Sequence, residues 1–158
     1  MGVQVLPGAP DPAGGANKRI YLIMDKDKKY IDLLWKIAID ISPVSNARIA
    51  SAVIIGNQVI GLGENSYKTH PFQAKYGSTE HHIHIHAEID AIKNSLKRVA
   101  VDDLKRATLY ISRAKKVDKY NWSYGLSKPC NGCMGAITDF GINRVVYSLD
   151  NEGYEELA

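Results

Sequence analysis

The order of the predicted secondary-structure elements constrains the fold of this 158-residue chain more than any other feature. A β-hairpin is predicted over 48–63. After it, the sequence predicts a helix that begins near His86, a strand over 107–112, a helix over 130–140 and a strand over 142–149. Strands that alternate with helices usually pair in parallel, because each connecting helix crosses over the sheet. The chain is therefore expected to form a layered α/β domain.

The N-terminal region differs in composition from the rest of the chain. Residues 1–16 include three Pro and four Gly and show no apolar period. A helix is predicted over 30–41, where apolar residues recur at helical spacing. We therefore expect residues 1–24 to be a disordered lead or a remnant of cloning, since Met24 can serve as the natural start. Residues 25–158 are expected to form one domain.

The composition excludes several classes of protein. Hydrophobic residues make up 45% of the chain and charged residues 23%, which is typical of a globular domain and argues against a largely disordered chain. No apolar run approaches the roughly 20 residues that a membrane helix needs, so no membrane partner is expected. The net charge of +3 permits an anionic ligand but does not by itself require a nucleic-acid partner.

The chain contains two cysteines, Cys130 and Cys133, which directly follow Pro129. A disulfide between them would close a very short loop and stabilise the fold little. The pair is therefore either a redox-active dithiol or half of a metal site. Both cysteines lie at the start of a predicted helix, where the helix dipole favours the thiolate form that binds metals.

The run His86-Ala87-Glu88 opens the other predicted helix. Both helix starts are expected at the same end of the sheet, where open α/β sheets bind their ligands. One imidazole and two thiolates suit zinc and would leave its fourth tetrahedral position for water. Glu88 lies on another side of the first helical turn than His86. It is therefore expected to exchange protons with that water rather than to bind the metal.

The two motifs, H-x-E and P-C-x-x-C, resemble those of the zinc-dependent cytidine and deoxycytidylate deaminase superfamily. The resemblance extends to the hairpin over 45–65 and to the helix and strand over 134–147, and it covers about residues 28–150. It implies a three-layer α/β/α, cytidine deaminase-like domain with a five-stranded mixed sheet.

The resemblance also implies a role for each site residue. Glu88 would be the catalytic proton shuttle, the backbone at Ala87 would help to hold the base, and Asn65 would contact the sugar. One catalytic Zn²⁺ ion per chain would be bound by His86, Cys130 and Cys133. Relatives form several kinds of homo-oligomer, so a homo-oligomeric, cytoplasmic protein is expected.

We expect hydrolytic deamination of a free cytosine nucleotide, such as dCMP or CMP, to the uracil form with release of ammonia. The alternative is deamination of a base within RNA or DNA, as in tRNA adenosine deaminases, which share the run His86 to Ile89. A third interpretation is a non-catalytic zinc domain that binds a partner, but such a domain would have little need of Glu88.

Two long polar segments leave alternatives open. Four of the five histidines lie in 80–86, where either a second metal site or an extended approach to the active site is consistent with the pattern. With no cysteine left over, a cysteine-built second zinc is not expected. The insertion 113–128, predicted to be irregular, combines basic residues with aromatic ones. Such a segment is either a single-stranded nucleic-acid groove or a solvated insertion or lid. Lys68, His70 and Lys75 are further candidates for binding a substrate phosphate.

Overall fold

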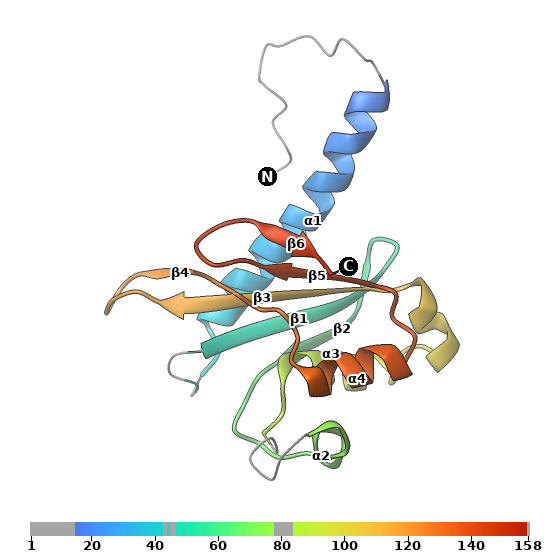
Figure 1. Cartoon of the computed structure of the whole chain (residues 1–158), viewed down its shortest axis with the longest axis vertical. Helices are drawn as coiled ribbons and strands as arrows, with labels where there is room; N and C mark the ends of the chain where they lie inside the picture. The colour runs from blue at the N-terminus through green and yellow to red at the C-terminus, as the bar shows by residue number, and fades with distance from the viewer. Residues whose placement is uncertain (1–14, 43, 45–46, 78–83, 158) are drawn as a thin grey trace.

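A computed structural model describes residues 15–42, 44, 47–77 and 84–157 (Figure 1). The fold is a mixed sheet with helices on both faces, as the sequence predicted. In chain order the elements are α1 (Gly15–Ile39), β1 (Ala47–Ile55), β2 (Gln58–Glu64), α2 (Pro71–Tyr76), α3 (Ala87–Ser95), the 3₁₀ helix η1 (Val101–Arg106), β3 (Thr108–Lys116), β4 (Trp122–Gly125), α4 (Asn131–Asp139), β5 (Arg144–Ser148) and β6 (Tyr154–Glu156).

The sheet has the strand order β2-β1-β3-β5-β6, and β4 pairs with the outer half of β3. β1 is antiparallel to both β2 and β3, whereas β3 and β5 run parallel, with Thr108 opposite Arg144. The chain passes from β3 to β5 through β4 and α4, so α4 is the crossover helix that this parallel pair requires. The carboxyl ends of β3 and β5 therefore lie at the same edge of the sheet.

Alternation along the strands separates two apolar cores. On β3, Leu109 and Ile111 pack with α3 and α4, whereas Tyr110 and Ala114 pack with α1. Figure 1 shows the same arrangement, with α1 on one side of the sheet and α3 and α4 on the other. The three layers predicted from the family resemblance are therefore present.

The sheet has six strands rather than the expected five. The insertion 113–128 is not irregular: β3 continues to Lys116 and returns as β4. At the other end of the sheet, the chain turns back on β5 to form β6, with Asn151 and Gly153 at positive φ. Short strands of this kind form because a longer strand already offers free backbone groups, which the local sequence does not show.

Helix α1 begins at Gly15, within the stretch 1–24 that the sequence predicts to be a disordered lead, and that division of the chain stays a prediction. Residues 1–14 lie outside the described residues. None of the described helices is both long enough and apolar enough to cross a membrane.

An ion pair between the buried Asp27 and the partly exposed Arg144 attaches α1 to the sheet. Arg144 of β5 donates two hydrogen bonds to the carboxylate of Asp27, at 2.9 and 2.6 Å, and the Tyr110 hydroxyl donates a third. Burial by itself raises the pKa of Asp27, but the bonds from Arg144 and Tyr110 outweigh it, and the pKa lies below its ordinary value. The carboxylate therefore stays ionised although Asp27 is only 6% exposed.

Candidate active site

His86 lies at the N-cap of α3, where α2 holds the backbone in place. The His86 N–H donates to Oε1 of Gln73, at 2.9 Å, and Gln73 is itself 1% exposed. α3 in turn packs tightly on β2, because a Cβ at Gly63 would lie 2.2 Å from the carbonyl oxygen of Ala87. The position of His86 therefore depends on α2, α3 and β2 together.

The cysteines lie at the start of α4, with Cys130 as its N-cap. Its Sγ accepts a hydrogen bond from the Cys133 N–H, at 3.5 Å. Just before them, Ser127 bonds to the carbonyl of Ile111 in β3 and to the N–H of Ser148 in β5, both at 2.9 Å. The cysteine motif is thus attached to the edge of the sheet at which β3 and β5 end.

Gly132, between the two cysteines, permits a close backbone contact with α2. A Cβ at this position would lie 2.2 Å from the carbonyl oxygen of Tyr76, the last residue of α2. Only glycine lacks that atom. The sequence Cys-Asn-Gly-Cys therefore allows α4 to pack against the same short helix that holds His86.

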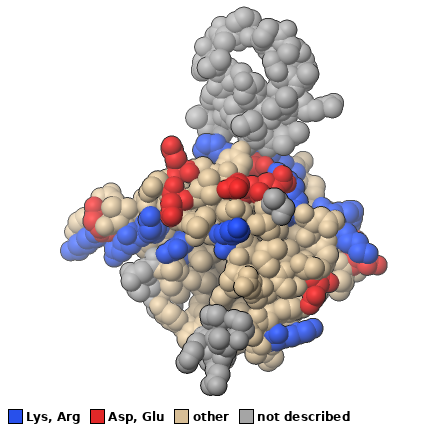
Figure 2. All heavy atoms as spheres, viewed as in Figure 1, with Lys and Arg blue, Asp and Glu red and all other residues tan. Residues whose placement is uncertain are grey.

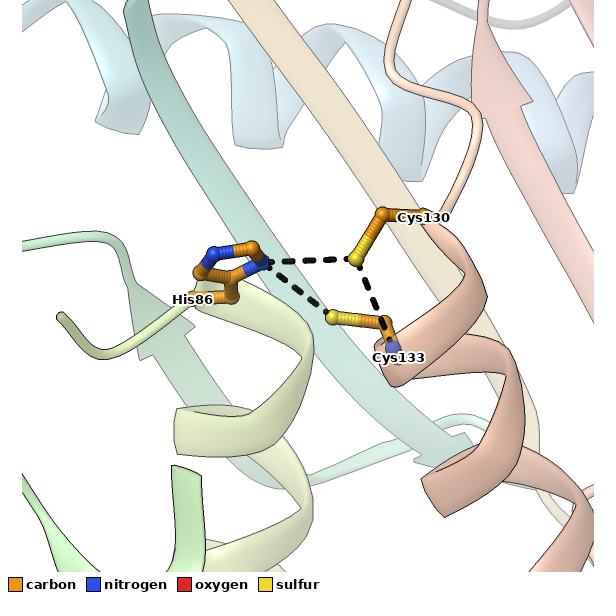
Figure 3. A group of neighbouring side chains, drawn as sticks. All are labelled: His86, Cys130 and Cys133. Atoms are coloured by element: carbon orange, nitrogen blue, oxygen red, sulfur yellow. Dashed lines mark hydrogen bonds between the residues drawn. The ribbon is translucent and has the colours of Figure 1, made fainter. Parts of the chain in front are cut away.

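The three predicted metal ligands meet in space. Nδ1 of His86 lies 3.7 Å from Sγ of Cys130 and 3.4 Å from Sγ of Cys133, and all three ligand atoms lie within 4.8 Å of one another. Figure 3 shows the imidazole facing both sulfurs. Both cysteines are free thiols, and a nitrogen and two sulfurs are ligands that zinc prefers. These residues fit one Zn²⁺ ion and would leave one coordination position open.

The electrostatics of the cluster show why its members differ. Hydrogen bonds from Cys133 and His86 lower the pKa of Cys130 to about 3, whereas the bond to Cys130 and burial raise the pKa of Cys133. The hydrogen bond to Cys130 also raises the pKa of His86. One thiolate thus already exists at neutral pH, and a divalent cation would stabilise the second.

Glu88 lies beside this cluster without belonging to it. Its side chain is 5% exposed and in hydrogen-bonding reach of the Cys133 thiol. Burial raises the pKa of Glu88, which brings this carboxyl closer to the range in which it exchanges protons efficiently at neutral pH. It lines a cavity of about 260 Å³ together with His86 and Cys130. The carboxyl and the metal site therefore open onto one small-molecule-sized space.

The predicted substrate contacts also line this cavity. Ala87 is 1% exposed and lies in the chain between His86, a candidate metal ligand, and Glu88. The Asn65 side chain bonds to the backbone of β1: Oδ1 accepts from the N–H of Ile49, at 2.9 Å, and Nδ2 donates to the carbonyl of Ala47, at 2.7 Å. One N–H and one lone pair of this amide remain for a ligand.

The cavity has further lining residues that the sequence analysis did not assign to the site. Arg113, Ser127 and Lys128 line it, as do Ile49 and Leu126. Arg113 and Lys128 belong to the insertion 113–128, which the sequence predicts to be irregular. A usable signal was the apolar alternation of Leu109 and Ile111, which, carried two residues further, places Arg113 on the same face of the strand.

The structure does not support a second metal cluster among the residues that it describes, where only His86, Cys130 and Cys133 form a group with ligand spacing. Of the histidines in 80–86, His81 and His82 lie outside the described residues. His84 lies edge-on to Tyr67, at 5.8 Å between ring centroids. His70 caps α2, with Nδ1 accepting from the N–H of Phe72.

Two aromatic residues of the insertion 113–128 pack on the protein itself. Tyr124 stacks on Trp35 of α1 at 4.8 Å, and Trp122 lies under the Arg48 guanidinium at 4.6 Å. Tyr120, at the tip of the hairpin, is 79% exposed. Tyr124 therefore packs the β3–β4 hairpin on α1 and Trp122 packs it on β1, so neither ring offers the open stacking surface of a nucleic-acid groove.

A nitrogen ligand and two sulfur ligands beside a buried carboxyl, in a cavity at the edge of a mixed sheet, define a hydrolytic zinc centre with an open coordination position. Residues 24–149 match the family model for the cytidine and deoxycytidylate deaminase zinc-binding region. The chain belongs to this family and is a zinc-dependent deaminase. A search of curated proteins gave no match.

Two solved structures with a similar fold are those of the dCMP deaminase from the cyanophage S-TIM5. The apo form is 15% identical, covers 80% of this chain and 82% of its own, and has a TM-score of 0.49. The form in complex with dCMP and dUMP is also 15% identical, covers 89% of this chain and 85% of its own, and has a TM-score of 0.47.

Proposed function

We propose that this deaminase acts on a free cytosine nucleotide of the dCMP or CMP type and converts it to the uracil form with release of ammonia. The observation that supports this is the cavity of about 260 Å³, which is lined by Glu88, by two of the three ligand residues, His86 and Cys130, and by two cationic side chains, Arg113 and Lys128. A cavity of this size suits a small molecule. The cations suit the negative charge that distinguishes a nucleotide from a nucleoside.

Each residue of the site has a separate role in the proposed reaction. When bound by His86, Cys130 and Cys133, zinc supplies a Lewis acid that activates water for attack on the amine-bearing ring carbon. Glu88 would accept one proton from the attacking water and deliver it to the ring nitrogen. It would then accept the remaining proton of the added hydroxyl and deliver it to the amine, so that the C–N bond breaks, ammonia leaves and the keto group forms. Ala87 and Asn65 hold the base and the sugar. The cytoplasmic location and the homo-oligomeric state stay predictions.

The Glu88→Gln variant tests the proposed chemistry. The amide has nearly the same shape but does not carry a proton between water and substrate. We therefore expect one zinc ion per chain to remain and turnover of dCMP to fall by at least roughly 10²- to 10⁴-fold. Metal analysis and ammonia release measure the two effects. Wild-type activity in the variant would contradict the role of Glu88.

A substrate panel tests the choice of ligand. It consists of CMP, dCMP, dCTP, cytidine, deoxycytidine, adenosine and a tRNA, with ammonia release as the readout. We expect dCMP or CMP to be the best substrate, with a rate that changes little between low and moderate salt. Faster turnover of the tRNA, with the steep salt dependence of polynucleotide binding, would favour the alternative function instead.

A group of basic side chains on the surface is the reason to include a polynucleotide among the substrates tested. Figure 2 shows Lys and Arg side chains gathered along the β3–β4 hairpin, where Lys115, Lys116 and Lys119 lie. Of these, Lys115 is within 3.5 Å of Asp150 and Lys116 lies over Trp122 at 5.9 Å. Because both have partners within the protein, the structure favours the free nucleotide.

A further inference from the structure

Arg113 lines the cavity but takes no part in the proton transfers of the proposed reaction. It lies on β3, two residues after Ile111, and therefore on the same face of the strand, the face that carries α3 and α4. Its neighbours across the sheet are Ile49 of β1 and Gly125 of β4. Ile49 and Arg113 both line the cavity, so the sheet forms the wall of the cavity at this point.

Gly125 leaves the space that this side chain occupies. A Cβ at Gly125 would lie 2.9 Å from Cδ of Arg113, 3.0 Å from its Cγ and 3.2 Å from its Nε. The first distance is shorter than real Cβ contacts and the other two are unusually tight, so any other residue at 125 would force the Arg113 side chain to shift. The hairpin of β3 and β4 therefore positions Arg113 as well as extending the sheet.

The Arg113 side chain makes no hydrogen bond or ion pair with any residue that the structure describes, and its Nε is buried without an acceptor. The charge of Arg113 acts on Asp150 and contributes to lowering the pKa of that carboxyl. The Asp150 carboxylate nevertheless accepts its hydrogen bonds from the N–H of Leu126, at 3.0 Å, and from Lys115, at 3.5 Å, and not from Arg113. A buried donor without an acceptor is costly, and proteins retain such groups mainly where they serve a function.

The charges around the cavity favour an anion near Arg113. Two thiolates would neutralise a bound Zn²⁺ ion, and among the residues that line the cavity the acidic side chain of Glu88 then faces two cationic ones, Arg113 and Lys128. The other candidate cations already have contacts within the protein. His70 caps α2, Lys75 lies over Tyr76 at 5.4 Å, and the cavity that contains Lys68 also contains Glu64 and Asp90.

We propose that Arg113, assisted by Lys128, binds the phosphate of the nucleotide and so selects nucleotides over nucleosides. The proposal rests on the proposed function, because it assigns a phosphate subsite to the same cavity. The guanidinium is suited to this task, since its fork of N–H donors matches phosphate oxygens in pairs. Arg113 is then a specificity-determining residue rather than a participant in proton transfer.

The test compares dCMP with deoxycytidine, which differ only in the phosphate, in the zinc-loaded full chain. In Arg113→Gln we expect kcat/KM for dCMP to fall roughly 10- to 100-fold and that for deoxycytidine to change less than about threefold. Arg113→Lys retains the charge and should recover part of the loss. Lys115→Gln is the matched control: it removes the same charge from the same face of β3 outside the cavity, and should change neither value.

The thermal stability of the Arg113→Gln variant distinguishes an arginine that binds phosphate from one that only stabilises the fold. Because Nε of Arg113 has no acceptor in the protein, Arg113→Gln should unfold at the wild-type temperature or above it. A large loss of stability, with equal losses for both substrates, would overturn the proposal. So would an unchanged preference for dCMP in the variant.

A binding measurement separates this proposal from the proposed reaction. Calorimetry with dUMP and deoxyuridine, on wild type and Arg113→Gln, needs no turnover. If dUMP binds more tightly than deoxyuridine only when Arg113 is present, the phosphate subsite stands even if cytosine nucleotides are not deaminated. If cytosine compounds are deaminated but dUMP binding does not depend on Arg113, the reaction stands and the phosphate subsite is wrong.

Discussion

At the scale of single residues, the two cysteines of the site are equivalent in the motif but not in the molecule. Cys130 is solvent-exposed, whereas Cys133 is fully buried beside Glu88. Each sulfur lies within 3.7 Å of the same imidazole nitrogen. The difference arises because Cys130 caps the helix from outside, while Cys133, three residues later, faces the core between α3 and α4.

Metal removal should reveal this difference. With zinc bound, both sulfurs are ligands, and neither should react with iodoacetamide at a significant rate. After chelation we expect Cys130 to be alkylated first and Cys133 only much more slowly, because its sulfur is not accessible. Mass spectrometry of peptides after timed labelling measures the order. Equal labelling of both cysteines, or no protection by zinc, would contradict the assigned site.

At the scale of elements, the site depends on how closely α3 approaches β2. Gly61 and Gly63 are the positions that allow it: a Cβ at Gly61 would lie 2.1 Å from Oγ of Ser95, and one at Gly63 would lie 2.2 Å from the Ala87 carbonyl oxygen. Neither glycine has a positive φ, so the requirement is space rather than backbone conformation. Both residues of the H-x-E motif therefore depend on a strand that contributes no ligand.

Gly63→Ala should displace α3 and, with it, both His86 and Glu88. We expect a loss of about 1–3 kcal/mol in the free energy of unfolding, as for other overpacked sites, together with weaker zinc binding. Gly135→Ala in α4 is the matched control, since its Cβ would meet nothing closer than 3.7 Å, and alanine favours a helix by up to about 1 kcal/mol. Chemical denaturation and chelator competition measure the two effects. A Gly63→Ala protein with wild-type stability and zinc affinity would refute this account.

Some of the secondary-structure elements could be predicted from local sequence patterns and others could not. The hairpin of β1 and β2, the helices α3 and α4 and the strand β5 were predicted because each carries its own periodicity and turn residues. β4 has only four residues and forms because β3 extends past its predicted end to pair with it. That pairing converts a predicted irregular insertion into the hairpin that positions Arg113.

At the scale of the whole molecule, the ion pair between Asp27 and Arg144 joins the first helix to the far half of the sheet. These residues are 117 positions apart in the chain. The contact lies on the α1 face, opposite the zinc site. Its contribution to stability is therefore separable from catalysis.

This ion pair predicts an acid-sensitive component of stability. The folded pKa of Asp27 lies below its unfolded value, so its contribution is complete above the unfolded pKa of about 4 and is lost as the pH falls through the folded pKa. Asp27→Asn should lower the free energy of unfolding by roughly 1–3 kcal/mol at pH 7, because it removes the charged acceptor of two hydrogen bonds from Arg144. Arg144 is partly exposed and keeps its ion pair with Glu156, which limits the loss.

Below about pH 4 the difference between Asp27→Asn and wild type should shrink. Denaturant titrations of both proteins at pH 7 and pH 3 measure it, and loss of zinc in acid affects both alike. Asp40→Asn, at the exposed end of α1, is the control and should change little at either pH. A difference that stays constant from pH 7 to pH 3 would show that Asp27 does not act through its charge.

The sequence by itself determined the α/β class, because the alternation of strand and helix patterns along the chain requires parallel pairing. It also predicted the three candidate zinc ligands and Glu88, because each motif consists of residues within a few positions of one another at the start of a helix. The tertiary structure decided what surrounds them. Only the pairing of β3 with β4 placed Arg113 in the cavity, and only the packing of α1 on the sheet used Trp122 and Tyr124 as structural residues. Local patterns specify which element forms, whereas the surroundings of a site depend on strands and helices that are distant in the chain and meet only when it folds.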